Sequence, residues 1–225
     1  MLNFFIVVPV FNEAPRIPEL VKRLKEYGFF EKTIFVDDGS TDGTAEIIRN
    51  SGGLCLKNVS NFGKGYSQRR GFEEALKKEA DFIVTMDGDL QHDPRWIPLL
   101  ISELLKGFDI VIGSRWKELH KMPKDRYLSN RLTTLAISLL VKKRLEDTQS
   151  GFRVYRRWVL EKVNFISNKF EAESELLIKA VFKGAKVSFV KIPALYSATL
   201  NSKIKRGKDT LRFMKMYFKI ALSRS

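Results

Sequence analysis

The sequence predicts an α/β fold in which helices flank an open, mostly parallel sheet. Short apolar runs of the kind found in β-strands alternate along the chain with segments whose apolar residues recur at helical spacing. Continuous apolar strands separated by helices are typical of parallel sheets that are covered on both faces. Polar motifs follow three of these runs, and parallel sheets bind ligands at the carboxyl ends of their strands.

The first four elements follow from the start of the chain. The apolar run from Phe4 to Val10 is interrupted by Pro9 and lacks the basic start and cleavage site of a signal peptide, so it predicts a buried strand. A helix is expected at Arg16 to Tyr27, a second strand at Thr33 to Asp37 and a second helix at Thr44 to Asn50. Glycine, serine, threonine and aspartate before that second helix predict a tight turn with a helix cap.

The alternation continues through the rest of the chain. Two further helices are expected, at Tyr66 to Glu79 and at Arg95 to Lys106, the latter opened by an Asp-Pro pair. The remaining strands are expected at Leu54 to Asn58, Phe82 to Met86, Asp109 to Gly113 and Lys186 to Ile192. We expect one domain over residues 1–200, followed by a basic amphipathic segment over residues 201–225 that packs on this domain or lies at a membrane surface.

Composition restricts the class of protein. The chain has 225 residues, of which 44% are hydrophobic, enough for one substantial domain with a core. Forty Lys and Arg residues against 26 acidic ones give a net charge of +14, which favours an anionic partner such as a nucleotide, a phospholipid surface, a phosphorylated substrate or a nucleic acid. Cys55 is the single cysteine, so an intrachain disulfide is excluded and a cytosolic location fits.

Two acidic motifs stand at expected strand ends. In VDDGSTDGT, the carboxylates of Asp37 and Asp38 repel each other unless another group interacts with them. A carboxylate there can accept hydrogen bonds from a nucleobase or ribose. In MDGDLQHDP, Asp87, Asp89 and Gln91 alternate, so in an extended segment they share one side and supply hard oxygen ligands. Mg or Mn suits this set, with water and a diphosphate in the remaining positions; the next histidine can join, but a zinc site is not expected.

Six motifs occur in the order VVPVFNE, VDDGSTDGT, NFGKG, MDGDLQHDP, GSR and DTQSGFR. This set resembles the family 2 glycosyltransferases, especially the branch that contains the dolichyl-phosphate mannose and glucose synthases. The resemblance covers residues 5 to about 155 densely and the remainder loosely. It implies a nucleotide-diphospho-sugar transferase fold of the GT-A type. It also implies inverting, metal-dependent transfer of a hexose, mannose or glucose, from a GDP- or UDP-sugar to dolichyl or polyprenyl phosphate.

The resemblance also implies roles for individual residues on the donor side. It gives Asp87 and Asp89 to the metal ion, with Gln91 as a third ligand, and makes Asp89 catalytic. The residues expected to bind the donor are Pro9, Phe11, Asn12, Glu13, Asp37, Asp38, Lys64, Asp87 and Gly88. Two glycines around Lys64 at a helix start also suit an anion, and a solvated surface lysine is the alternative.

A lipid monophosphate already carries negative charge near pH 7, so its transfer needs no general base and its pocket should be cationic. The residues expected to bind the acceptor phosphate are Arg115, Arg126, Ser129, Arg131, Arg153 and Lys203. Arg115 and Arg131 resemble acceptor positions of the synthases and are expected to be catalytic. Asp147 and Gln149 are expected to meet sugar hydroxyls or to order the arginines. Glu173 is expected to contact the sugar or to be a helix-start acid without function.

Basic segments that contain apolar and aromatic residues predict contact with an anionic membrane surface. They are RLTTLAISLLVKKR, residues 131–144, and GKDTLRFMKMYFKIALSRS, from residue 207; core helices with solvated lysines are the alternative. We expect peripheral attachment to the cytoplasmic face of a membrane, directly or through a membrane-anchored partner subunit, and no nucleic-acid binding. A saccharide acceptor is the alternative to a lipid phosphate, and it requires a carboxylate base, for which Glu173 is the first candidate.

Overall fold

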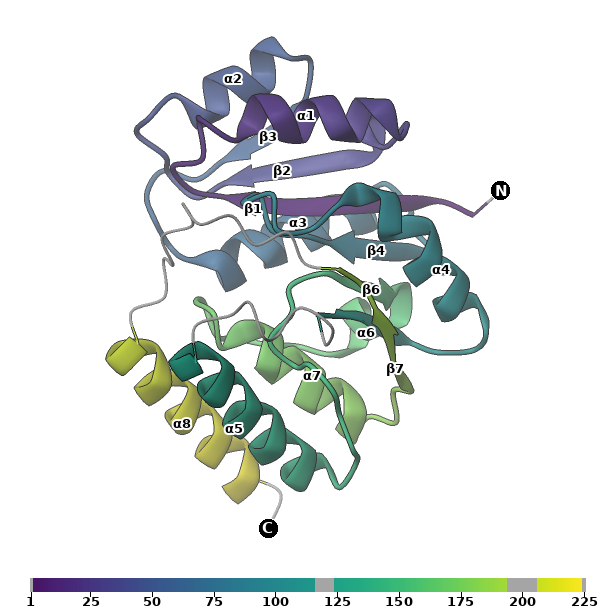
Figure 1. Ribbon diagram of the computed structural model, residues 1–225, viewed down its shortest axis with the longest axis vertical. Coiled ribbons are helices and arrows are strands. Elements are labelled where there is room, and N and C mark those ends of the chain that lie inside the picture. The colour runs from purple at the N-terminus through teal and green to yellow at the C-terminus, as the bar shows by residue number, and fades with distance from the viewer. Residues whose placement is uncertain (1, 116–123, 194–205, 224–225) are drawn as a thin grey trace.

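One sheet organises the described chain, and its strands follow the order β3-β2-β1-β4-β6-β5-β7 (Figure 1). A computed structural model describes residues 2–115, 124–193 and 206–223. The strands are β1 (Phe4–Val10), β2 (Thr33–Asp37), β3 (Leu54–Lys57), β4 (Phe82–Thr85), β5 (Ile110–Ser114), β6 (Arg153–Arg156) and β7 (Val187–Lys191). All neighbouring pairs are parallel except those of β6, which is antiparallel to β4 and to β5. The expected open, mostly parallel sheet is confirmed.

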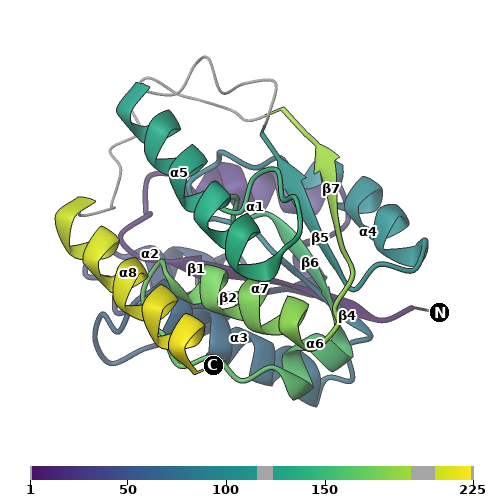
Figure 2. The same cartoon turned by 90° about the horizontal axis from the view of Figure 1, so that it is seen from below.

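Helices cover both faces of this sheet (Figures 1 and 2). One core joins the sheet to α1 (Ile17–Glu26), α2 (Thr44–Asn50) and α4 (Ile97–Leu105), and a second core joins it to α3 (Lys64–Lys77), α5 (Lys124–Val141), α6 (Arg157–Lys162), α7 (Ala172–Phe182) and α8 (Arg206–Leu222). Short 3₁₀ turns lie at Phe30–Lys32 and Pro94–Trp96. Successive strand side chains point to opposite faces, so Val7 belongs to the second core while Ile6 and Val8 belong to the first.

The six expected strands and four expected helices all form, with ends that differ from the expected ones by two residues or fewer. Among the strands that the structure describes, β6 is the one that the sequence did not predict. It begins and ends with arginine and lacks the apolar pattern of a buried strand. Arg153 is nevertheless fully buried, and Arg156 donates hydrogen bonds to the carbonyls of Phe108 and Leu104 at 2.7 and 2.9 Å. Backbone carbonyls inside the fold therefore accept hydrogen bonds from the arginines of β6. Because these charged residues interrupt the apolar pattern, the sequence does not show the strand.

Helix α8 packs on the rest of the chain. Its residues Met216 and Ile220 belong to the core that α5 and α7 share, and the Tyr217 hydroxyl donates to the Ala136 carbonyl of α5 at 3.2 Å. None of the described helices has the length and the apolar character that crossing a bilayer requires.

Candidate active site

The antiparallel strand β6 brings a distant loop to the carboxyl edge of the sheet. Thr85, the last residue of β4, lies opposite Arg153, the first residue of β6. The loop that precedes β6, residues 147–152, therefore meets the polar motif that follows β4. The Thr85 hydroxyl fixes this meeting point by donating to the Gly151 carbonyl at 2.9 Å.

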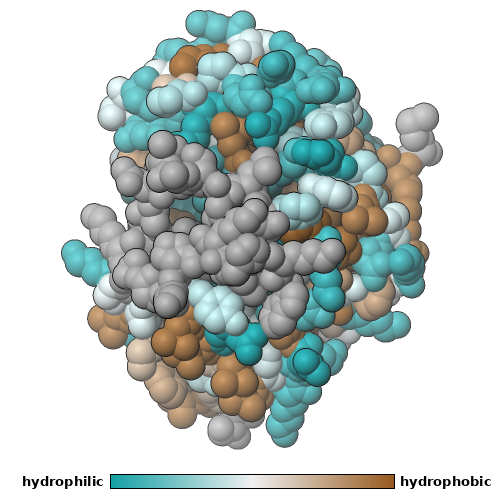
Figure 3. Space-filling model, in the orientation of Figure 1, coloured by the Kyte–Doolittle hydropathy of each residue, from teal (hydrophilic) through white to brown (hydrophobic). Residues whose placement is uncertain are grey.

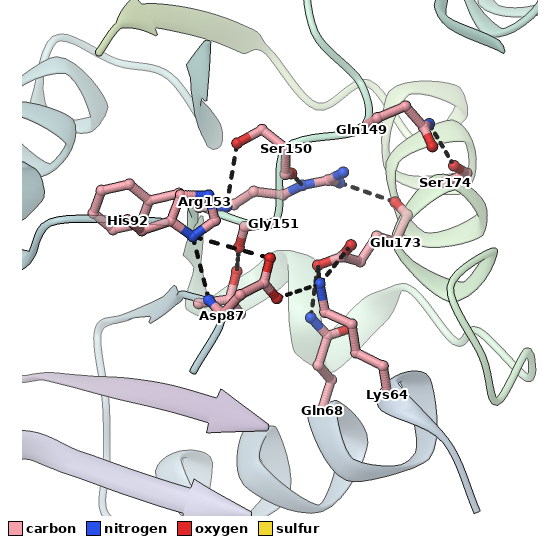
Figure 4. Close-up of polar contacts among 12 residues, drawn as sticks. Lys64, Gln68, Asp87, His92, Gln149, Ser150, Gly151, Arg153, Glu173 and Ser174 are labelled. Carbon is pink, nitrogen blue, oxygen red and sulfur yellow. Dashed lines mark hydrogen bonds and ion pairs between the residues drawn. The ribbon is translucent and has the colours of Figure 1, made fainter. Parts of the chain in front are cut away.

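Lys64 joins two carboxylates at this edge (Figure 4). It is the first residue of α3, and its ammonium lies 2.6 Å from Asp87 and 3.1 Å from Glu173, near the start of α7. Gln68, one turn further along α3, donates to Glu173 at 2.8 Å. The Lys64 side chain is 14% exposed, so the alternative of a solvated surface lysine is wrong.

The two aspartates of the acidic motif are in different electrostatic states. Burial by itself raises the pKa of Asp87, but the Lys64 ammonium outweighs it and lowers that pKa to about 2. Burial and the charge of Asp87 raise the pKa of Asp89 to about 6. Asp89 is thus a carboxylate that lacks sufficient positive charge nearby, and a divalent cation would supply it.

The loop around Asp89 is tightly constrained. Asp89 accepts hydrogen bonds from the backbone and side-chain nitrogens of Gln91, at 3.0 and 2.7 Å. Leu90 between them has a φ of 65°, a conformation that is costly for a branched side chain. Among the described residues no three His, Cys, Asp or Glu side chains are grouped to hold a metal ion. The oxygens of Asp87, Asp89 and Gln91 fit a hard divalent cation that keeps further ligands of its own.

His92 holds this loop through a hydrogen bond and a ring contact. Its Nδ1 atom accepts a hydrogen bond from the backbone N–H of Asp87 at 3.3 Å, and its ring stacks on Phe152 with the ring centres 5.1 Å apart. Burial, together with the cations of Arg115 and Lys64, lowers the pKa of His92 to about 4 against the pull of Asp87. The imidazole is therefore neutral near pH 7, with its proton on Nε2.

Gly151 touches the same cluster where a larger residue has no room. A Cβ atom at this position would lie 2.6 Å from an Asp87 carboxylate oxygen and 2.7 Å from the Lys64 nitrogen. The loop thus depends on glycine at this position in order to approach the acidic motif.

The same loop holds Arg115, which follows β5. Asp147 accepts hydrogen bonds from the Arg115 Nε and Nη2 atoms at 2.9 and 3.0 Å, and both side chains are buried. Burial opposes ionisation of Asp147, but the adjacent guanidinium lowers its pKa below the usual range. A bidentate pair of this kind fixes the plane of the guanidinium. Of the two roles expected for Asp147, the structure displays the ordering of an arginine.

The position of Arg153 does not fit the predicted contact with an acceptor phosphate. It is fully buried, and its guanidinium donates to the carbonyls of Ser150, Thr148 and Glu173 at 2.7, 2.8 and 3.0 Å. These bonds tie the 147–152 loop to the first turn of α7. Gln149, which was expected to meet the sugar or the arginines, points to the same helix and donates to the Ser174 hydroxyl at 3.4 Å (Figure 4).

The ends of β1 and β2 form a second group of polar residues. Asp38 accepts hydrogen bonds from the backbone nitrogens of Phe62 and Gly63 at 3.0 and 2.7 Å, so it orders the loop that leads into Lys64. Asp37 is fully buried, and one of its carboxylate oxygens has no hydrogen-bond partner within the described ranges. Asn12 adopts a φ of 49°, and its side-chain oxygen accepts from the Thr41 nitrogen at 3.0 Å.

The remaining donor-side residues lie at the same edge. Pro9 is paired with Val36 inside the sheet, and Phe11 follows directly after β1, half-buried. Glu13 is buried, and its carboxylate Oε2 atom lies 2.5 Å from the Nη1 atom of Arg16. Gly88 packs so closely on β1 that a Cβ atom would lie 2.7 Å from Val10.

The remaining acceptor-side residues lie on or near α5. Ser129 and Arg131 are exposed on this helix, and the Arg131 guanidinium lies 5.9 Å from the Tyr127 ring centre. A small cavity of about 10 Å³ is lined by both Arg131 and Asp147, so Arg131 borders the residue that holds Arg115. The Arg126 side chain and Lys203 lie outside the described residues.

Two residues that contact the site, Gln68 and Gly151, were not predicted as site residues from the sequence. Gln68 follows Lys64 by four residues, so the i, i+4 spacing on one helix face was a usable signal. The packing of Gly151 against Asp87 carries no such signal, because 64 residues separate the two positions.

Several known proteins are similar to this chain in sequence. The uncharacterized protein MJ1222 of Methanocaldococcus jannaschii is 32% identical over 228 residues, which is 99% of this chain and 92% of that protein. Glycosyltransferase AglJ of Haloferax volcanii is 27% identical over 82% of this chain. The undecaprenyl-phosphate 4-deoxy-4-formamido-L-arabinose transferase of Pseudomonas aeruginosa is 32% identical over 69% of it. The chain spans only 60% and 48% of these last two proteins.

One solved structure matches this fold well. Glucosyl-3-phosphoglycerate synthase from Mycobacterium tuberculosis, crystallised with Mn²⁺, UDP-glucose and phosphoglyceric acid, superposes with a TM-score of 0.77 at 19% identity, covering 98% of this chain and 80% of that one. This likeness supports the GT-A fold. The family model described as Glycosyl transferase family 2 matches residues 5–163, which include the acidic motif, Arg115 and the 147–152 loop. The chain therefore belongs to glycosyltransferase family 2.

Proposed function

We propose that this chain is an inverting, metal-dependent glycosyltransferase that moves a hexose, mannose or glucose, from a GDP- or UDP-sugar to polyprenyl or dolichyl phosphate at the cytoplasmic face of a membrane. One observation carries the proposal. A single loop links the acidic motif to a buried arginine, because Gly151 packs against Asp87 while Asp147 holds the Arg115 guanidinium. If the acidic motif binds a cation and Arg115 binds a phosphate monoester, as we propose, the two adjoin.

The relatives support the class of reaction. One is named as acting on undecaprenyl phosphate, and the structural neighbour was crystallised with Mn²⁺ and a UDP-sugar. We assign Mg or Mn to Asp87 and Asp89, with Gln91 as a third ligand. When bound, the ion supplies charge stabilisation to the departing nucleoside diphosphate.

The protein's own residues bind and orient the two substrates. We assign the donor to residues that follow or end β1, β2 and β4 and to the start of α3, which are Pro9, Phe11, Asn12, Glu13, Asp37, Asp38, Lys64, Asp87 and Gly88. We assign the acceptor phosphate to Arg115, oriented by Asp147, and to Arg131, with Arg126, Ser129 and Lys203 nearer the entrance. Arg153 is assigned a positioning role instead, because backbone carbonyls occupy its guanidinium.

Glu173 supports a lipid phosphate over a saccharide as the acceptor. A sugar hydroxyl must lose a proton to a general base, whereas a phosphate monoester near pH 7 need not. The Glu173 carboxylate is paired with the Lys64 ammonium and accepts a hydrogen bond from Gln68. This arrangement suits an orienting group better than a base.

Transfer of radiolabelled sugar to a short polyprenyl phosphate tests the proposal, with a panel of GDP- and UDP-sugars and either Mg or Mn. The wild type should form an acid-labile labelled lipid with one donor, and Asp89→Ala should form none. Glu161→Ala removes an exposed carboxylate from α6 and should behave as wild type. Glu173→Gln should weaken the transfer without abolishing it. Metal-dependent donor hydrolysis without lipid product would reject the lipid acceptor and point to a saccharide.

A further inference from the structure

Helix α5 carries a row of exposed leucines. Leu128, Leu132, Leu135 and Leu139 are each between 55% and 68% exposed and recur every three or four residues. The opposite side of the same helix is buried, where Ile137 lies in the core. Because the core-facing side is already apolar, the exposed row is additional to what folding requires.

Helix α8 carries a matching row. Leu211, Met214, Phe218 and Leu222 are between 46% and 74% exposed and share one side of the helix. Met216 and Ile220 occupy the buried side. Both helices therefore have two apolar sides, of which only one is covered by other residues that the structure describes.

The two rows form one surface. The helices lie side by side in both ribbon views, and Tyr217 bonds to Ala136 across their boundary (Figures 1 and 2). A groove of about 450 Å³ runs between them, lined by Leu128 and Leu132 on one wall and Met214 on the other. Hydrophobic side chains gather at the lower left of the molecule, over these helices (Figure 3). We name the eight residues of the two rows the α5–α8 apolar face.

Positive charge borders this face. At about 100° per residue, Lys208, Arg212, Lys215 and Lys219 form a strip on α8 that adjoins its apolar row, and all four are exposed. Arg131 is exposed beside the leucine row of α5. The acidic residue described on α8, Asp209, is largely buried and pairs with Arg212 at 2.8 Å. An apolar stripe with a basic edge is the pattern of a helix that lies in the interface of an anionic bilayer.

We propose that the α5–α8 apolar face docks on an anionic lipid bilayer, with the leucines, Met214 and Phe218 among the acyl chains and the basic strip at the headgroups. A second copy of the chain fits this face less well. A twofold axis that runs across the two helices would bring the same basic strips together, where they repel each other. An anionic bilayer attracts them instead.

This orientation deepens the proposed function, on which the following step rests. Arg131 belongs to α5 and also lines the small cavity with Asp147, the partner of Arg115. Docking through α5 and α8 would therefore bring the acceptor-binding arginines to the depth of lipid phosphates. The acceptor would reach the site without leaving the bilayer.

Sedimentation with vesicles that contain no polyprenyl phosphate tests the docking directly. The full chain should sediment with phosphatidylglycerol-containing vesicles, less so at high salt, and should remain in solution with pure phosphatidylcholine. Leu135→Gln with Phe218→Gln should reduce binding at least tenfold. The matched control, Leu99→Gln with Leu105→Gln, removes two exposed leucines of α4 and should bind as wild type.

A second pair of variants tests the charge. Lys215→Glu with Lys219→Glu should reduce binding to anionic vesicles at least tenfold, whereas Lys22→Glu with Lys77→Glu makes the same net change elsewhere on the exposed surface and should have a small effect. Circular dichroism confirms folding of each variant. The proposal fails if wild type ignores anionic vesicles at low salt, or if the face variants bind as wild type. It also fails if light scattering shows a dimer that the face variants dissociate while vesicles are not bound.

The two proposals can fail separately. Transfer to a short, water-soluble polyprenyl phosphate without vesicles measures the chemistry alone, and the face variants should retain it. Intact transfer without vesicle binding overturns the docking surface only. Vesicle binding without any transfer leaves the surface standing and overturns the proposed reaction.

Discussion

His92 Nδ1 accepts a hydrogen bond from the backbone N–H of Asp87 at 3.3 Å. A buried, neutral imidazole therefore supports the first acidic residue of the motif. This contact uses the nitrogen that faces Asp87, so His92 is better suited to hold the loop than to bind the ion through that atom. Its stacking on Phe152 connects the acidic motif to the end of the 147–152 loop. His92 is thus a positioning residue that links both halves of the site.

His92→Phe should keep the ring packing but leave the Asp87 N–H without an acceptor. Loss of a supporting hydrogen bond behind a metal ligand costs roughly ten- to a hundredfold in metal affinity or activity. The concentration of Mn that gives half-maximal activity should rise accordingly. His92→Asn, whose side-chain oxygen can replace Nδ1, should recover most of the loss. Equal metal affinity in wild type and His92→Phe would contradict the positioning role.

Gly151→Ala should damage the site because its methyl group would lie within 2.7 Å of both Asp87 and Lys64. Overpacking of this kind costs about 1–3 kcal/mol. Displacement of the Asp87 carboxylate should lower the rate of donor turnover by more than the loss of unfolding free energy alone would explain. Gly207→Ala, where a Cβ meets nothing within 4 Å, is the matched control and should leave urea denaturation nearly unchanged. Normal turnover in Gly151→Ala would show that the loop can retreat from Asp87.

The sheet was largely predictable because each parallel strand is a continuous apolar run. Strand β6 was not, because its arginines donate hydrogen bonds to the carbonyls of distant residues, Glu173 and Phe108, and those partners are brought near only by folding. The same physics explains the error over Arg153. An arginine in a polar motif resembles a phosphate ligand until its partners are known.

The acidic motif was predictable because its residues are adjacent in the chain. The contacts that surround it connect distant positions, as when Gln68 reaches Glu173 across 105 residues. Only the antiparallel course of β6 places the 147–152 loop against Asp87. Nothing local in the sequence shows that course.

Lys64→Met should leave Asp87 and Glu173 without their shared cation. Removing one partner of a buried ion pair costs about 3–5 kcal/mol, so the melting temperature should fall. Mn should then stabilise the variant more than it stabilises wild type, because the ion can replace the missing charge at Asp87. Lys78→Met removes an exposed lysine near the end of α3, whose pair with Glu74 contributes at most about 1 kcal/mol. Equal Mn-induced shifts in Lys64→Met and wild type would argue that Lys64 does not act on the metal site.

Asp147→Asn should reveal the pH dependence of the buried pair with Arg115. The folded state lowers the pKa of Asp147, so its contribution to stability is present above the ordinary aspartate value and is lost as the pH falls through the folded value. At pH 7 the variant leaves a buried guanidinium without its counter-charge and should unfold about 3–5 kcal/mol more easily.

Urea denaturation of both proteins between pH 7 and pH 3 measures this effect. The difference in unfolding free energy between them should be constant near neutrality. It should narrow below about pH 4, where the Asp147 carboxyl of the unfolded wild type begins to take up a proton that the folded state resists. A gap that stays constant down to pH 3 would mean that Asp147 supports Arg115 through shape and hydrogen bonds alone, and the electrostatic account of the pair would have to be abandoned.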